Sequence, residues 1–173
     1  AASDVYKRQL VKGGVSLVFC RVVVRGGPQP YFYRLLDPIR RRLPIAASGE
    51  LMLLRRSLFE ELIPLAPCEA EDTYIMFKAL ELGYKVRFCE GCWVKTQRTR
   101  NLLDEERYKR RTVRGIYQAL SLTKPPPFIR LFYAALPFAT PILLMLGKKG
   151  LHWVKGILEG VADFLRWRIK GKG

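Results

Sequence analysis

Residues 131–147 form an uncharged and largely apolar stretch of 17 residues, which limits the possible folds of this chain more than any other feature of the sequence. Lys and Arg residues flank the stretch on both sides. A transmembrane helix needs about 17 to 25 such residues, and Pro137 and Pro141 would kink a helix at this place. The sequence therefore predicts a spanning or re-entrant membrane segment in preference to the core helix of a soluble protein.

The last part of the chain shows a second helical pattern. Its charged residues recur at steps of three and four and therefore share one helical face: His152, Lys155, Glu159, Asp163, Arg166 and Lys170. Its aliphatic residues occupy another face: Val154, Leu158, Val161 and Leu165. This pattern is typical of an amphipathic helix at a membrane surface. The alternative is a second, less apolar span, in which the GxxxG pair Gly156 and Gly160 would help helices to pack.

The first two thirds of the chain alternate between strand and helix patterns, which predicts an α/β fold. Apolar and β-branched runs predict strands over 15–24 and 51–54. Helical periodicity predicts helices over 57–62, 74–82 and 102–122. Two short alternating runs on either side of a Glu-Gly pair predict a β-hairpin over residues 84–96.

The run Pro125–Pro127 is the clearest boundary in the sequence. We assign residues 10–124 to a globular α/β part and residues 125–173 to membrane-inserted and interfacial helices. Residues 1–9 contain the sequence DVYKRQ, which resembles a translated sequencing adaptor. We therefore expect them to be a remnant of library preparation, and we leave them out of the fold.

The chain carries a net charge of +16, from 31 Lys and Arg against 15 Asp and Glu. A balance this basic requires an anionic partner, for which nucleic acid, anionic lipid and phosphorylated substrates are the candidates. His152 is the only histidine, which excludes a multi-histidine metal site and speaks against a Ser-His-Asp or Cys-His nucleophile. Cys89 and Cys92 form a CxxC pair, but a zinc site needs about four ligands, so we interpret them as cysteines of the hairpin turn.

Glu71 and Asp72 form a carboxylate pair just before the predicted helix 74–82. In one interpretation the pair is structural: Asp72 accepts the free N–H groups of the first helical turn, and Glu71 balances the positive end of the helix dipole. In the other, a carboxylate kept ionised at a helix N-terminus is well placed to act as a general base. One carboxylate can fulfil both roles.

Several motifs follow one another from about residue 15 onward. They are Gly49 within a run of small residues, Arg55-Arg56-Ser57-Leu58-Phe59, Glu71-Asp72, KALELGYKVRF, an arginine-rich helix and then apolar segments. This order resembles the C-terminal half of a family 2 glycosyltransferase. Members of that family have a nucleotide-diphospho-sugar-binding GT-A fold, often followed by membrane helices. The resemblance implies that residues 10–124 are the acceptor-side half of a GT-A domain.

The resemblance also implies roles for residues of the first two motifs. Asp72 stands at the position of the catalytic base in the family's ED motif, with Glu71 beside it. Gly49 and its neighbours would line the acceptor side, because only a small residue lets a sugar approach the backbone closely.

A third family motif is present only in part. Processive members carry QxxRW on an interfacial helix, and Tyr108–Thr112 stands in its place with only Arg111 retained. An arginine there suits a diphosphate leaving group, and Arg110 and Arg114 are further substrate-binding candidates. The alternative for this basic run is a solvated or lipid-facing surface.

The family's DxD motif, which carries the metal and the donor diphosphate, is absent from the sequence. The resemblance therefore implies that the divalent metal, Mg²⁺ or Mn²⁺, and most of the donor site are held by residues encoded upstream. We accordingly expect the 173-residue chain alone to be inactive.

The predicted function is inverting transfer of a sugar from a nucleotide-sugar donor to a polysaccharide or lipid-linked acceptor, at the cytoplasmic face of the cell membrane. The alternative is a membrane-tethered basic module that binds nucleic acid or anionic lipid without catalysis. The basic residues are spread through every segment and no nucleic-acid-binding motif is present, so we expect membrane lipids but no nucleic acid among the partners.

Overall fold

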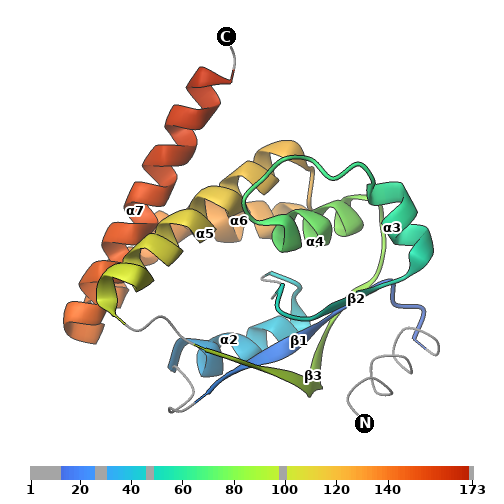
Figure 1. Cartoon of the computed structure of the whole chain (residues 1–173), viewed down its shortest axis with the longest axis horizontal. Coiled ribbons are helices and arrows are strands. Elements are labelled where there is room, and N and C mark those ends of the chain that lie inside the picture. The colour runs from blue at the N-terminus through green and yellow to red at the C-terminus, as the bar shows by residue number, and fades with distance from the viewer. Residues whose placement is uncertain (1–12, 26–30, 46–48, 98–100, 172–173) are drawn as a thin grey trace.

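The computed structural model describes residues 13–25, 31–45, 49–97 and 101–171 (Figure 1). The elements follow in the order β1 (Leu17–Val24), α2 (Tyr31–Arg42), β2 (Met52–Leu54), α3 (Arg56–Leu62), α4 (Glu71–Glu81), β3 (Val86–Thr96), α5 (Leu102–Leu122), α6 (Pro127–Leu143), η1 (Leu144–Leu146) and α7 (Gly147–Lys170). A small sheet combined with helices confirms the predicted mixed class at this level. Residues 1–9 lie outside the described residues, and so does the prediction made for them.

The described strands form one sheet in the order β2-β1-β3, with β1 antiparallel to β2 and parallel to β3. The central strand β1 is buried on both faces. Leu17 and Phe19 belong to a large core cluster with the helices, whereas Val18 and Cys20 belong to a smaller cluster. This alternation follows the two-residue period of a strand and explains why the run is apolar throughout.

The predicted hairpin over residues 84–96 is wrong. These residues form the single strand β3, which runs parallel to β1. Between two consecutive residues of β1 the pairing steps from Cys89 to Trp93, so residues 90–92 form a bulge. The bulge shifts the alternation of β3, and both Cys89 and Cys92 are therefore buried. Its Glu-Gly pair resembles a tight turn in the sequence because a bulge and a turn both favour such residues.

The main core lies between the sheet and helices α4, α5 and α6. Phe77 of α4 and Tyr133 of α6 pack edge to face, with their ring centroids 5.8 Å apart. The Tyr133 hydroxyl donates a hydrogen bond to the backbone carbonyl of Ile45. Residues on both sides of the Pro125–Pro127 run therefore share one core.

Helix α6 continues through two internal prolines. Pro141 has no N–H and cannot bond to the carbonyl of Pro137 four residues earlier. The hydroxyl of Thr140 donates to that carbonyl instead, at 2.6 Å. The Thr140 hydroxyl thus replaces the N–H donor that Pro141 lacks, so the carbonyl of Pro137 keeps a hydrogen bond. Side chains do the same in helices that lie in apolar surroundings.

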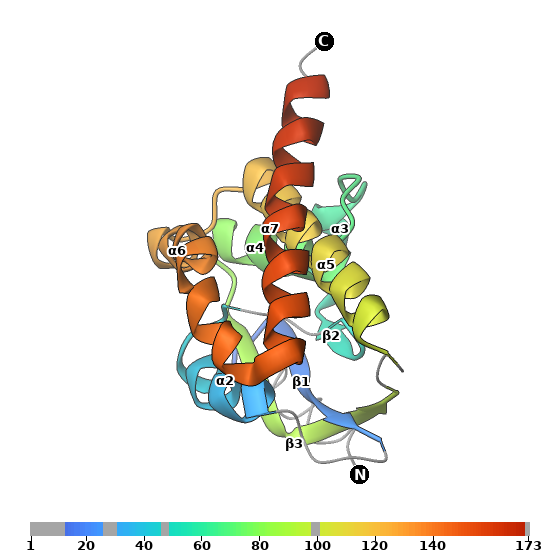
Figure 2. The ribbon, with the colours of Figure 1, turned by 90° about the vertical axis from the view of Figure 1, so that its left-hand side faces the viewer.

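Helix α7 packs lengthwise against α5 (Figure 2). A Cβ atom at Gly156 would lie 2.6 Å from the carbonyl oxygen of Glu106, and one at Gly160 would lie 2.6 Å from that of Arg110. Both distances are too short for any side chain, so the GxxxG pair brings α7 against the backbone of α5.

Part of the charged face of α7 lies against α5. Asp163 is buried and accepts two hydrogen bonds from Arg110, at 2.5 and 3.0 Å. Glu106 of α5 is also buried, and it pairs with Lys155 at 2.7 Å and with His152 at 2.6 Å. On the predicted aliphatic face, Leu158 and Leu165 are 47% and 50% exposed, whereas Val154 and Val161 are half-buried.

The substitution Glu106→Gln is expected to weaken this contact in a pH-dependent way. Lys155 and His152 lower the pKa of Glu106. Its carboxylate therefore stabilises the fold above the ordinary glutamate pKa of about 4.3, and this contribution is lost as the pH falls through the lowered pKa. Thermal unfolding should show a lower midpoint for the variant at about pH 7 and a smaller difference at about pH 3.

A matched control is Glu60→Gln, which removes a carboxylate from an exposed i,i+4 pair with Arg56 on α3. Exposed pairs of this kind contribute little to stability. Equal effects of the two substitutions at both pH values would contradict a specific role of Glu106 in the α5–α7 contact.

Within the described residues, one helical run, Pro127–Lys170, is long and apolar enough to cross a membrane. The mean hydropathy of its most apolar window is 1.7, and only 17% of that window is buried. A core helix of a soluble protein would be mostly buried. By length and composition, the run agrees with the membrane segment predicted from the sequence.

Candidate active site

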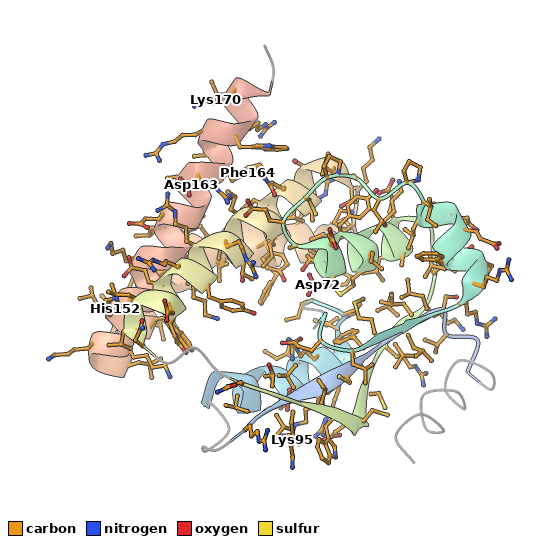
Figure 3. The ribbon with its side chains drawn as sticks, viewed as in Figure 1. Asp72, Lys95, His152, Asp163, Phe164 and Lys170 are labelled. Carbon is orange, nitrogen blue, oxygen red and sulfur yellow. The ribbon has the colours of Figure 1, made fainter. Side chains whose placement is uncertain are left out.

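Asp72 lies in the first turn of α4, which begins at Glu71 (Figure 3). One oxygen of its carboxylate, Oδ1, accepts hydrogen bonds from the backbone N–H of Thr73 at 2.7 Å and from the Thr73 hydroxyl at 3.3 Å. The helix dipole at this end favours an ionised carboxylate. Asp72 thus satisfies one free N–H group of the helix while Oδ2 has no hydrogen bond to a described residue.

Gly49 lies directly against Asp72, although the two are far apart in the sequence. A Cβ atom at Gly49 would come within 2.9 Å of both the Cβ and the Oδ2 atom of Asp72. No side chain can occupy that space without moving the carboxylate. The structure therefore brings together two of the residues that the sequence nominated.

A pocket of about 480 Å³ opens beside Asp72. Its charged lining residues are Arg40, Glu50, Glu69, Asp72, Lys109 and Arg111, Tyr108 and Thr112 add hydroxyl groups, and α6 supplies the largest share of its apolar lining. This volume falls in the range of small-molecule sites, which combine a mostly apolar lining with a few polar groups. The pocket can hold a ligand whose polar part meets the carboxylate of Asp72.

The three nominated arginines of α5 differ in their surroundings. Arg111 lines the same pocket as Asp72, and no ion pair is found for it among the described residues. Arg110 lies outside the pocket lining and pairs with Asp163. Arg114 also lies outside it, where it binds Glu69 through two hydrogen bonds and approaches Asp163 within 3.8 Å. Of the three nominated arginines, Arg111 is therefore the one that can meet a ligand in the pocket; Arg40, which the sequence did not nominate, lines it as well.

Glu71, the second nominated carboxylate, is exposed and does not line the pocket. Sequence reasoning did not nominate Glu50, Tyr108 or Thr112, all of which do. Burial of its hydroxyl is the main cause that raises the pKa of Tyr108, and the negative charges of Glu50 and Asp72 raise it further. The sequence contained one signal for Tyr108 and Thr112. Together with Arg111 they have the i, i+3, i+4 spacing that puts side chains on one face of a helix.

The buried cysteines do not form a metal site. Cys20, Cys89 and Cys92 lie in one apolar cluster behind the sheet. Burial and a hydrogen bond with Cys89 raise the pKa of Cys92 to about 12, so its thiol stays protonated at neutral pH. In the part of the chain that the structure describes, no group of three or more His, Cys, Asp or Glu side chains could hold a metal ion. These residues therefore do not supply the divalent metal site that the family resemblance implies.

Comparison of the chain with protein-family models, with curated proteins and with solved structures gives no match.

Proposed function

We propose that the chain is the acceptor-side part of a membrane-associated, inverting glycosyltransferase with a GT-A type catalytic domain. The observation that carries the proposal is the pocket that Asp72 and Arg111 share, with Gly49 packed against the carboxylate. A carboxylate oxygen without a hydrogen bond to a described residue can accept a proton, and a cation in the lining of the same pocket can stabilise a developing negative charge. Both groups suit glycosyl transfer to a hydroxyl.

In the proposed reaction, Asp72 accepts the proton of an acceptor hydroxyl as its oxygen attacks the anomeric carbon of the donor. The bond from that carbon to the nucleoside diphosphate breaks on the opposite face, so the anomeric configuration inverts. Arg111 stabilises the negative charge that develops on the departing diphosphate. The residues that bind the nucleotide belong to a segment with a DxD motif, which this sequence does not contain.

We also propose a membrane location, with the pocket on the cytoplasmic side where nucleotide sugars are found. Phe138 and Met145 of the α6–η1 segment are 85% and 87% exposed. Lys124 and Arg130 lie near one end of this segment, and Lys148 and Lys149 follow the other. An uncovered apolar surface with basic ends is suited to anionic lipid.

The experiment that tests the function is a transfer assay. Membranes from cells that produce the protein together with the proposed donor-binding segment are incubated with a panel of radiolabelled nucleotide sugars. Incorporation into lipid or polysaccharide is expected with the parent protein and is expected to be lost with Arg111→Ala. Absence of transfer from every donor, together with salt-sensitive binding to RNA or anionic vesicles, would favour the basic binding module instead.

The substitution Gly49→Ala is expected to lower kcat by about 10²-fold, the usual cost of misplacing a catalytic group by about 1 Å. The added methyl group would collide with the Cβ and Oδ2 atoms of Asp72. Steady-state transfer kinetics and thermal unfolding measure activity and stability separately. Gly91→Ala is the matched control, since a Cβ atom there meets nothing within 4 Å. Equal kcat values for the two variants would show that Asp72 tolerates a side chain at position 49.

A further inference from the structure

The lining of the pocket combines two kinds of side chain. One kind is polar and includes Glu50, Asp72 and Tyr108. The other kind is a single helical stripe of apolar side chains on α6: Phe132, Ala135, Leu136, Ala139 and Leu143. A ligand that fills the whole pocket therefore needs a polar head and an apolar body.

Helix α6 is apolar on its opposite side as well. Leu131, Phe138 and Ile142 are 71%, 85% and 68% exposed. A helix that is apolar all round belongs in a protein core or in hydrocarbon, and α6 has only one packed side. Ala135 and Ala139 line the pocket and are themselves exposed, so the pocket opens beside α6. Their small side chains leave room for a hydrocarbon chain to enter from the apolar side of the helix.

The polar part of the lining is suited to a neutral head. Its three carboxylates, Glu50, Glu69 and Asp72, are matched by three cations, Arg40, Lys109 and Arg111, so its formal charges cancel. Carboxylates accept hydrogen bonds from hydroxyl groups, and Lys and Arg side chains donate to them. The hydroxyl groups of Tyr108 and Thr112 can both donate and accept. These side chains match the several hydroxyl groups of a sugar better than a phosphate.

We infer that the acceptor is a neutral glycolipid, whose sugar hydroxyl meets Asp72 and whose hydrocarbon chain lies along the pocket stripe of α6. The inference rests on the proposed function for the reaction, but the binding mode itself requires neither donor nor turnover. A soluble glycan is the competing acceptor, and it would leave the pocket stripe of α6 uncovered.

The test is photo-crosslinking with a dodecyl maltoside that carries a diazirine at the end of its chain. The protein, in membranes, is labelled without donor, and the labelled peptides are mapped by mass spectrometry. We expect labelling of pocket residues on α6, and competition by unlabelled dodecyl maltoside at a concentration at least tenfold below that of maltose. Each buried methylene is worth about 0.8 kcal/mol, or about fourfold in affinity.

Two alanines of α6 supply the variants. Ala139→Trp fills the pocket beside the apolar stripe of α6 and is expected to reduce the competed labelling at least tenfold. Ala134→Trp adds the same side chain to the same helix outside the pocket lining and is expected to leave it unchanged. Equal labelling of the two variants, or equal competition by maltose and dodecyl maltoside, would overturn the inference.

The two proposals fail in different ways. If unlabelled dodecyl maltoside reduces the labelling of α6 but no sugar transfer is found, the proposed reaction is overturned and the amphiphile site is retained. Transfer to maltose that is as fast as transfer to dodecyl maltoside, without competed labelling, would uphold the reaction and identify a soluble acceptor.

Discussion

The substitution Asp72→Asn is expected to lower sugar transfer by about 10²- to 10⁴-fold, the usual contribution of a general base. The amide of Asn can still accept the hydrogen bond from the N–H of Thr73, so we expect α4 and the pocket to persist. It cannot accept a proton from the acceptor hydroxyl. Transfer rate and nucleotide-sugar affinity are measured separately, in the protein produced with the proposed donor-binding segment. Only the rate should change.

The control for this substitution is Asp104→Asn. Asp104 is an acidic residue in the first turn of α5, as Asp72 is in the first turn of α4, and it does not line the pocket. The two changes remove similar interactions with a helix dipole. If Asp72→Asn stays within tenfold of the parent rate, Asp72 is a residue that only stabilises the start of α4.

Local patterns predicted most of the described elements. The 3.6-residue period of residues 102–122 matches α5 from end to end, and the β-branched run at 15–24 contains β1. The hairpin prediction was wrong because a local pattern does not show which strand an apolar run pairs with. Here β1 binds both halves of β3, and the apparent turn is a bulge.

The orientation of α7 could not be predicted for a similar reason. Its sequence shows a charged face and an aliphatic face, but not which of them meets the protein. The carboxylates Glu105 and Glu106 of α5 are buried beneath it, and they accept hydrogen bonds from its Trp153 and Lys155. Side chains more than forty residues away thus decide which charged residues of α7 are buried.

The candidate site was predictable in part. The motif order nominated Gly49, Asp72 and Arg111, and the structure brings Gly49 against Asp72 and places Arg111 in the lining of the same pocket. Arg110 could not be separated from Arg111 in the sequence, because its partner Asp163 lies on α7. The pocket itself depends on how α6 packs across α4 and α5, which no single segment encodes.

The uncovered surface of α6 leads to the second large expected effect. We expect the parent protein to remain in the membrane fraction through both high salt and alkaline carbonate. The double substitution Phe138→Asp with Ile142→Asp is expected to weaken membrane partitioning by about 10²- to 10⁴-fold. Burial of one such side chain is worth about 1.5 to 3 kcal/mol, and about 1.4 kcal/mol corresponds to a factor of ten. Deletion of α6 is unsuitable as a test, because Ile129 and Tyr133 belong to the core.

The matched control is Phe59→Asp with Ile63→Asp, which changes the same residue types in α3 and directly after it, where they are 45% and 53% exposed. Because this control adds the same negative charge, it separates loss of hydrocarbon contact from repulsion by anionic lipid. Both variants must keep the thermal unfolding midpoint of the parent for the comparison to hold. If the parent protein is released by salt alone, or if the two variants leave the membrane equally, α6 is not buried in hydrocarbon. The basic surface would then be what holds the protein to lipid, and the alternative of a basic binding module would gain support.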